Sequence, residues 1–322
     1  MTLLFIACAK PAPAGFRVAL VTPGSISDAA WNSGAYAGLL WIRDSLGAVV
    51  SQVESRTPGE QEDNLRRYAA EGYDLVFGHG FEFQAAAERV SRRFPSTVFV
   101  ITSGERQAGN VSPLIFRLHE ATYLAGRVAG GMSRTGIIGF VGGIELPPIK
   151  LGYEGWVNGA RSVRPSVQTR SVYLNTFDDV AAGQEAAMQL IRFGADMLTH
   201  NADAAALGLF QAARTSPGVY LFGANADQSA LAPERVLGSA VIDLPRAFLQ
   251  VGREVKSGGF KPKVESFGLS SGVVRYGPNP ALLGLVPVEV SAGVTRARDS
   301  IIAGTLDPLV APGPVMARSE AH

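Results

Sequence analysis

Four β-rich stretches in the N-terminal third of the chain decide the fold: FRVALVTPG at residues 16–24, AVVSQVE at 48–54, DLVFGHG at 74–80 and TVFVITSG at 97–104. A segment of helix length separates each stretch from the next. The first such segment, residues 28–46, repeats apolar residues at helical spacing from Trp31 to Leu46. Because strands and helices alternate, the sequence predicts a parallel sheet joined by right-handed helical crossovers.

The same alternation begins again after VSPLIFRL (111–118) and a helix-length segment at 119–133. Its strand-like stretches are GIIGFVGG (136–143), VQTRSVYL (167–174), ADMLTH (195–200), GVYLFG (218–223) and RVLGSAVID (235–243). Two such series predict an α/β protein with two doubly wound, parallel-sheet lobes. The helices and strands that follow residue 243 are too few for a third domain, so we expect them to return to the two lobes.

This pattern divides the chain into four parts. We expect residues 16–118 and about 243–260 to form lobe 1, and residues 119–242 and about 261–307 to form lobe 2. Residues 1–15 are interpreted as a lipoprotein-type signal and linker. The Pro- and Ala-rich residues 308–322 are expected to be a flexible tail.

The composition excludes several classes of protein. With 322 residues, of which 47% are hydrophobic, the chain can bury large cores, and it is not a disordered protein. Its net charge of +1 provides no field that would attract nucleic acid. No apolar stretch approaches the roughly 20 residues that a membrane-spanning helix needs.

The single cysteine, Cys8, ends an apolar run in MTLLFIACAKPAPAGF (1–16). A lone cysteine excludes a disulfide within the chain, and we expect neither a metal site nor a cofactor. The run resembles the end of a bacterial lipoprotein signal, although Phe5 stands where Leu is usual and a basic segment is missing, so we expect the natural start to lie upstream. We therefore predict that Cys8 is lipidated and anchors the protein to the cell membrane, facing the periplasm or the exterior; the alternative is an accidental cysteine in an apolar tail.

Ligands of open parallel sheets bind beyond the carboxyl ends of the strands, which directs attention to the residues that follow each predicted strand. Aromatic, amide and acidic side chains gather there, and we expect a ligand to contact Asp28, Trp31, Asn32, Phe81, Ser103, Phe177, Asn201, Asp203, Asn225 and Asp227. Trp31 and Phe177 come from different lobes and could hold a flat ring between them. Few basic residues follow the strands, which argues against a phosphate or carboxylate ligand.

Each of these residues also has a purely structural interpretation. Trp31 and Phe177 could belong to the core, and Asp28, Asp178 and Asp203 could cap the helices that follow them. His200 is better explained as an interior histidine than as a base. No motif of a hydrolase, a zinc protease or a P-loop enzyme occurs, so we predict no enzymatic activity.

Several longer segments resemble the BMP family (basic membrane protein, PnrA-like) of ABC-transporter substrate-binding lipoproteins. They are DAAWNSGAYAGL (28–39), GHGFEF (78–83), HEATYLAGRVAGGMSRTGIIGFVGGIELP (119–147), NTFDD (175–179), GVYLFGANADQ (218–228) and VLGSAVID (236–243). The resemblance implies a type I periplasmic-binding-protein fold with a three-crossover hinge, a small-molecule ligand in the cleft between the lobes, and an ABC permease as partner. It also implies a monomer, and a purine base stacked between Trp31 and Phe177 beside Asn32.

Three positions depart from what the resemblance implies for nucleoside-binding members, and residues 200–205 stand in place of a glycine-rich segment. Ser103 replaces an acidic residue, Asn225 replaces the first Asp of a GxDxDQ-like segment, and Ile242 replaces a sugar-binding Lys. We therefore expect a purine nucleoside or nucleobase, with another flat heterocycle such as a flavin as the alternative ligand. A membrane-anchored sensor that presents its closed form to a signalling partner is the alternative function, and a hydrolase on this scaffold is a third.

Overall fold

The first lobe forms around a six-stranded sheet with the strand order β11-β5-β4-β3-β1-β2, in a computed structural model that describes residues 15–312. All neighbouring strands in it are parallel. Its strands are β1 (Arg17–Thr22), β2 (Val49–Glu54), β3 (Leu75–His79), β4 (Val98–Thr102), β5 (Val111–Phe116) and β11 (Glu265–Phe267). Its helices are α1 (Trp31–Leu46), α2 (Pro58–Ala70), η1 (Phe81–Phe83), α3 (Gln84–Ser91) and α8 (Leu244–Lys256).

The second lobe repeats this plan with the strand order β12-β10-β9-β8-β6-β7, in which only β12 is antiparallel to its neighbour. Its strands are β6 (Ile137–Gly142), β7 (Gln168–Tyr173), β8 (Met197–Asn201), β9 (Tyr220–Asn225), β10 (Val236–Ile242) and β12 (Val274–Pro278). Its helices are α4 (Leu118–Met132), α5 (Pro147–Arg161), α6 (Val180–Arg192), η2 (Asp203–Ala206), α7 (Leu207–Arg214), η3 (Ser229–Leu231), η5 (Pro280–Leu285) and α9 (Val288–Ile302), and η4 (Leu269–Ser271) lies in the last connection between the lobes.

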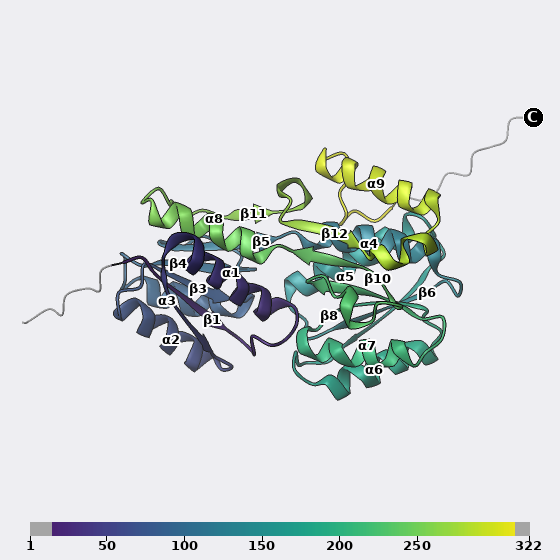
Figure 1. Cartoon of the computed structure of the whole chain (residues 1–322), viewed down its shortest axis with the longest axis horizontal. Helices are drawn as coiled ribbons and strands as arrows, with labels where there is room; N and C mark the ends of the chain where they lie inside the picture. The colour runs from purple at the N-terminus through teal and green to yellow at the C-terminus, as the bar shows by residue number, and fades with distance from the viewer. Residues whose placement is uncertain (1–14, 313–322) are drawn as a thin grey trace, which may run out of the picture.

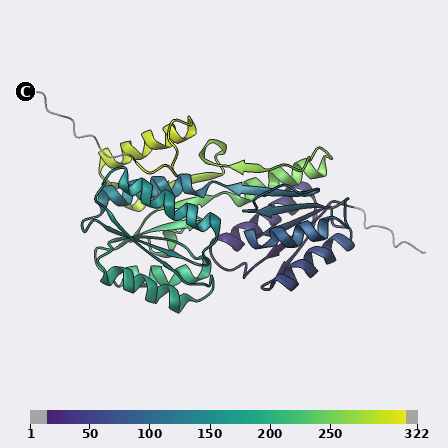
Figure 2. The same ribbon diagram turned by 180° about the vertical axis from the view of Figure 1, so that it is seen from behind.

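Helices cover both faces of each sheet, as Figures 1 and 2 show from opposite sides. In lobe 1, α2 and α3 pack on one face and α1 and α8 on the other; in lobe 2, α6 and α7 lie opposite α4 and α5. The inner strands are consequently buried along their whole length, as β3 and β10 are. The predicted fold class, two doubly wound lobes, is confirmed. No helix within residues 15–312 is both long and apolar enough to cross a lipid bilayer.

Glycines allow α4 and α5 to pack backbone against backbone. A Cβ atom on Gly159 would collide with the carbonyl oxygen of Tyr123, and one on Gly126 would collide with that of Trp156. The two helices can approach this closely only because neither glycine has a side chain. This contact fixes α4, the first element after the chain enters lobe 2, against the rest of that lobe.

Three crossovers join the lobes, and hydrogen bonds connect them into one hinge. The amide of Arg117 in the first crossover donates to Phe267 O in the third at 2.8 Å, and the amide of Asp243 in the second donates to Val273 O at 2.7 Å. Glu120, a buried residue of α4, accepts a hydrogen bond from the Leu269 amide at 2.6 Å. Burial raises the pKa of Glu120. The Arg117 guanidinium, 2.7 Å from the carboxylate, opposes this increase.

The structure differs from the expected lobe boundaries at two points. β11 pairs with β5 in lobe 1, so the third crossover follows Phe267 instead of about residue 260. A three-residue strand carries no periodicity that assigns it to a sheet, which is why the sequence placed it in lobe 2. Pro308, expected to begin a flexible tail, is buried, and its carbonyl accepts a hydrogen bond from Asn158 Nδ2 at 3.0 Å. Cys8 and most of the predicted signal segment lie outside the described residues.

Candidate functional site

The carboxyl ends of the strands of one lobe face those of the other lobe across the pocket. Each sheet contains a point where the strand order reverses, between β1 and β3 in lobe 1 and between β6 and β8 in lobe 2. Such reversals open a crevice at the carboxyl ends of the strands, where ligands of doubly wound folds bind. A pocket lies between the two lobes at this place, with Pro23, Gly80 and Glu82 on one side and Leu146 and Asn201 on the other.

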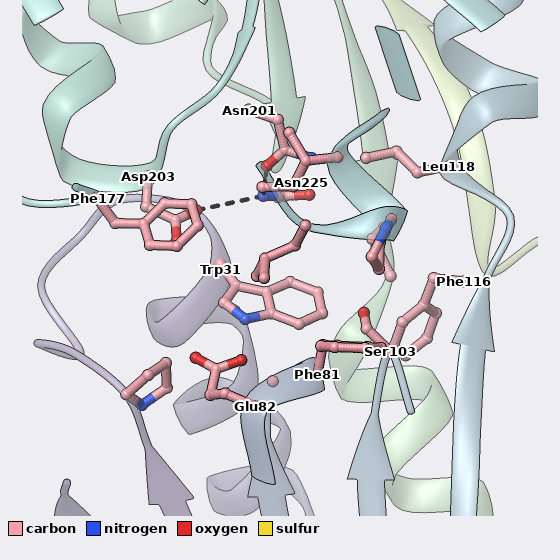
Figure 3. A pocket seen from close by; sticks show the side chains of 16 residues that line it. Trp31, Phe81, Glu82, Ser103, Phe116, Leu118, Phe177, Asn201, Asp203 and Asn225 are labelled. Atoms are coloured by element: carbon pink, nitrogen blue, oxygen red, sulfur yellow. Dashed lines mark hydrogen bonds between the residues drawn. The ribbon is translucent and has the colours of Figure 1, made fainter. Parts of the chain in front are cut away.

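Seven of the ten residues expected to contact a ligand line this cleft pocket (Figure 3). They are Trp31, Phe81 and Ser103 of lobe 1 and Phe177, Asn201, Asp203 and Asn225 of lobe 2. Asn32 lines an adjoining pocket that shares Glu82, Phe177 and Asp203 with the first. The strand pattern thus predicted that residues as distant in sequence as Trp31 and Asn225 share one pocket, because each ends or follows a strand of one of the two sheets.

Asp227 does not belong to the pocket. It is exposed, and its carboxylate accepts a hydrogen bond from the Ser229 amide at 3.0 Å. The chain has already turned away from the cleft into η3 at this point, which the count of residues after β9 did not reveal. Asp227 is thus a turn residue on the surface of lobe 2.

Trp31 begins α1 and lies on a buried histidine. Its ring is stacked on the His79 imidazole, with 4.1 Å between centroids and 23° between planes, and meets Phe116 edge-on at 6.1 Å. His79 Nε2 lies 3.0 Å from the Trp31 carbonyl oxygen, and Nδ1 lies 2.9 Å from Thr102 Oγ1. Because a carbonyl only accepts, Nε2 carries the proton and Nδ1 accepts from the hydroxyl. Burial lowers the pKa of His79 to about 3, so this imidazole is neutral.

Phe177 belongs to the segment between β7 and α6 and is seated on a glycine. A Cβ atom on Gly143, which follows β6, would collide with the Phe177 ring. The absent side chain of Gly143 makes room for this aromatic ring. Each lobe thus contributes to the pocket an aromatic ring packed on a defined neighbour: Trp31 on His79 in lobe 1 and Phe177 on Gly143 in lobe 2.

The acidic residues of the site differ in their partners. Asp28 accepts hydrogen bonds from the amides of Ala30 (3.0 Å), Asn32 (2.6 Å) and Ser33 (3.0 Å), so it caps the start of α1 from a position within the loop. Among the described residues, the Asp203 carboxylate accepts only a long hydrogen bond of 3.4 Å, from Asn225 Nδ2, which also lies 3.3 Å from Asn201 Oδ1. Burial raises the pKa of Asp203 well above its ordinary value, and Asp28 and Glu82 add to this effect.

Two expected helix caps are not found. Asp179, not Asp178, caps α6 by accepting from the Ala182 amide at 2.9 Å. Asp178 instead pairs with Arg56 of lobe 1 at 2.7 Å, which connects the lobes beside the pocket. Asp203 begins η2 with a positive φ of 46° and caps no helix. His200 is an interior residue, as the sequence predicted: it is buried, and its Nε2 lies 2.8 Å from Gln228 Oε1.

Strained backbone is concentrated at the cleft. The non-glycine residues with positive φ in the described part of the chain are Ala29 (58°), Ser103 (57°), Asn175 (58°), Asp203 (46°) and Asn225 (65°). All five follow or end strands at the cleft edge of a sheet, and left-handed backbone costs free energy in residues other than glycine. Such strain is typical of binding sites, where it aims side chains that regular structure could not place.

The sequence did not identify Glu82 as a site residue, although it lines both pockets. It stands between Phe81 and Phe83, and of these residues only Phe81 was expected to contact a ligand. Its position directly after β3, at the strand-order reversal, was the signal that could have identified it. Apolar wall residues such as Phe116, Leu118 and Ile149 carried no signal, because they are indistinguishable from core. Ile242, noted as a replacement for Lys, also lines the pocket.

Sequence comparison identifies relatives of this chain. Residues 16–295 match the profile of the family described as ABC transporter substrate-binding protein PnrA-like. The Basic membrane protein A of Borreliella afzelii is 29% identical over 296 residues, which cover 89% of each chain. A purine-binding protein of Brucella abortus is 27% identical over 79% of this chain and 70% of that one. The ABC transporter nucleoside-binding protein of Lactococcus lactis subsp. cremoris is 26% identical over 90% and 88%.

Structural comparison supports the same architecture. A solute-binding protein of an ABC transporter system from Aeropyrum pernix K1 superposes with a TM-score of 0.85 over 93% of this chain and 94% of that one. Its sequence identity is 21%, so this likeness shows the fold alone.

Proposed function

This chain belongs to the PnrA-like family of ABC transporter substrate-binding proteins, as its motifs predicted, and we propose that its cleft binds a flat heterocycle of the purine nucleoside or nucleobase class. Members of such a family bind a solute outside the cytoplasm and deliver it to a permease in the membrane. The observation that carries the proposal is the pair Trp31 and Phe177, one aromatic from each lobe at the same pocket. A ring held between them contacts both lobes at once and so stabilises the closed form.

The purine class is supported by the printed names of two relatives, a purine-binding protein and a nucleoside-binding protein. The pocket supplies hydrogen-bonding groups for the edges of a base from Asn201, Asp203 and Asn225. A buried polar group that a ligand leaves unpaired costs about 1–3 kcal/mol, so these side chains discriminate between similar rings.

The sugar is expected to contribute less than in nucleoside-binding relatives. Ser103, Asn225 and Ile242 occupy the three positions where the resemblance implies charged residues, and all three line the pocket. An aliphatic side chain at Ile242 offers a ribose hydroxyl nothing to bond. We therefore propose that the base, not the ribose, provides most of the binding free energy.

A thermal-shift screen tests this function directly. The protein from about Ala9 onward is mixed with purine and pyrimidine bases, their nucleosides, riboflavin and a phosphorylated nucleoside. A ligand at a hundred times its Kd adds about 2.7 kcal/mol to the free energy of unfolding. We expect the largest shift from a purine or its nucleoside, with similar affinity for both. No shift with any base or nucleoside would overturn the ligand class while leaving the family assignment intact.

Membrane attachment through Cys8 is part of the proposal. The apolar run before Cys8 supports it, and an anchored receptor stays close to its permease. Expression of the full chain in a bacterial host with a labelled fatty acid should give a labelled protein, and a Cys8→Ala variant should remain unlabelled. Equal labelling of both proteins would exclude Cys8 as the attachment site.

A further inference from the structure

Glu82 presents a carboxyl group to the pocket from lobe 1 and forms no ion pair with any residue from 15 to 312. It follows Gly80, whose φ of 147° few other residues adopt, and a Cβ atom on Gly80 would collide with the Glu82 carboxyl. Burial raises the pKa of Glu82, and the only opposing influence is a hydrogen bond from its own backbone. The missing side chain at Gly80 thus lets this carboxyl group lie over the loop and line the pocket (Figure 3).

Asp203 offers a second carboxyl group from the opposite lobe. The acidic groups that act on it are Asp28, Glu82 and Asp178. Asp28 is bonded to three backbone amides at the start of α1, and Asp178 is paired with Arg56, whose other partner is Glu54. His79 is neutral. Glu82 and Asp203 are therefore the two carboxyl groups of the pocket whose charges have no counter-ion within the described residues.

Asn32 adds an unsatisfied acceptor next to these acids. Its side chain is only 4% exposed, and its Oδ1 is buried without a hydrogen-bond partner within the described residues. It lines the adjoining pocket together with Glu82 and Asp203. A buried acceptor without a donor costs about 1–3 kcal/mol, so a ligand that brings N–H groups here recovers free energy.

The remaining walls suit a positively charged ring. Trp31, Phe81, Phe116 and Phe177 line the pocket, and aromatic faces attract cations. Among the described residues, the lining of the cleft pocket contains no Lys or Arg. The adjoining pocket contains Arg56, which is already paired with Glu54 and Asp178. The two acids, the unpartnered amide oxygen and the aromatic faces all favour a cationic ligand. With a neutral ring, each buried carboxyl group either carries a charge without a counter-ion or binds a proton.

We propose that the cleft selects a flat heterocycle carrying a positive charge, which Glu82 of lobe 1 and Asp203 of lobe 2 neutralise together. The inference rests on the proposed function and narrows its ligand to a protonated or N-alkylated ring. Without ligand, closure brings two carboxyl groups from opposite lobes into one poorly solvated pocket, which opposes closure. A cationic ring between the two carboxyl groups removes the repulsion between them. Its charge therefore stabilises the closed form in addition to attracting each carboxyl group.

Matched pairs of probes test the charge separately from the ring. Adenosine is neutral and 1-methyladenosine is cationic at neutral pH; nicotinamide and 1-methylnicotinamide form a second pair outside the purine class. Titration calorimetry should give at least about tenfold tighter binding of the cationic member of a pair. Glu82→Gln and Asp203→Asn should each reduce this preference, whereas Asp227→Asn, an exposed acid outside the pocket, should leave it unchanged.

The pH dependence provides an independent readout. The charge of 1-methylnicotinamide does not titrate, so its affinity should rise from about pH 5 to about pH 8 as the two carboxyl groups lose their protons. In Glu82→Gln this rise should be smaller. An affinity that is independent of pH, or that falls as the pH rises, would contradict the proposal.

The outcomes separate this inference from the function on which it rests. If neutral purines bind as tightly as cationic ones, the charge selection is wrong and the purine class stands. If only the cationic pyridine binds, and does so through Glu82, the charge selection stands and the purine class is wrong. If no member of either pair binds to the folded protein, both are wrong. A variant that fails to bind must show the thermal stability of the parent before its result counts.

Discussion

The indole ring of Trp31 lies on the imidazole of His79 at 4.1 Å, and the same imidazole bonds the Trp31 backbone carbonyl. His79 ends β3, so the first residue of α1 is held against a strand at the centre of the lobe 1 sheet. A neutral, fully buried base below the ring keeps it in place without adding charge to the pocket. The two residues therefore support each other through ring stacking and a hydrogen bond.

Trp31→Ala should weaken ligand binding by about tenfold to a hundredfold, because stacking of a base on an aromatic side chain contributes about 1–3 kcal/mol. Trp31→Phe keeps a ring and should recover most of the affinity. Trp41 lies on the same helix but is 50% exposed and outside the cleft pocket, so Trp41→Ala is the matched control. Calorimetry with the best purine of the screen measures the effect. Equal affinities for the two alanine variants would make Trp31 a core residue.

His79→Gln should reduce the loss of stability in acid. An unfolded histidine binds a proton below about pH 6.5, whereas folded His79 binds one only near pH 3. The unfolded state therefore holds more protons in this window, and the free energy of unfolding falls as the pH decreases through it, by about 1.4 kcal/mol per pH unit at most. The variant lacks this group and should show a shallower decrease in urea unfolding.

Other buried groups make the comparison with the parent necessary. His119 and His200, whose pKa values burial lowers to about 4, add decreases of the same sign. Burial raises the pKa values of Glu82, Glu120 and Asp203, and such carboxyl groups have the opposite effect, losing stability as the pH rises. These contributions are common to both proteins and cancel in the difference. Parallel curves for the two proteins would mean that His79 does not resist protonation.

The ion pair between Arg56 and Asp178 should slow opening of the cleft. Both side chains are half exposed, so the pair contributes at most about 1 kcal/mol and is screened by salt. Arg56→Gln should therefore raise the dissociation rate of the ligand up to about fivefold at low ionic strength, measured by stopped-flow fluorescence. Arg89 pairs with Glu62 within lobe 1, and Arg89→Gln should not change the rate. A difference that persists in high salt would point to a cause other than the ion pair.

The sequence could predict the position of a residue where the local pattern of strands and helices determines it, but not where a contact distant in the chain does. Strand ends such as Ser103 and Asn201 could be assigned to the cleft, because the topology of alternating strands and helices fixes where strands end. Glu82 also follows a strand end, but its position over Gly80 depends on a contact that the sequence does not reveal. The ion pair of Asp178 could not be predicted from the sequence, because its partner Arg56 lies 122 residues away on the other lobe. Likewise, only the pairing of β11 with β5 assigns its three residues to lobe 1.

Gly159→Ala should destabilise lobe 2, whereas Gly152→Ala on the same helix should not. At Gly159 a Cβ atom collides with backbone of α4, which cannot yield as a flexible side chain would, so we expect a loss of about 1–3 kcal/mol. At Gly152 no atom lies within 4 Å of the added carbon, and the better helix propensity of alanine should raise stability by about 0.5–1 kcal/mol. Urea unfolding of both variants measures the two effects, which have opposite signs although the substitution is the same. If Gly159→Ala were as stable as Gly152→Ala, α4 and α5 could not be in backbone contact, and the anchoring of α4 in lobe 2 would need another explanation.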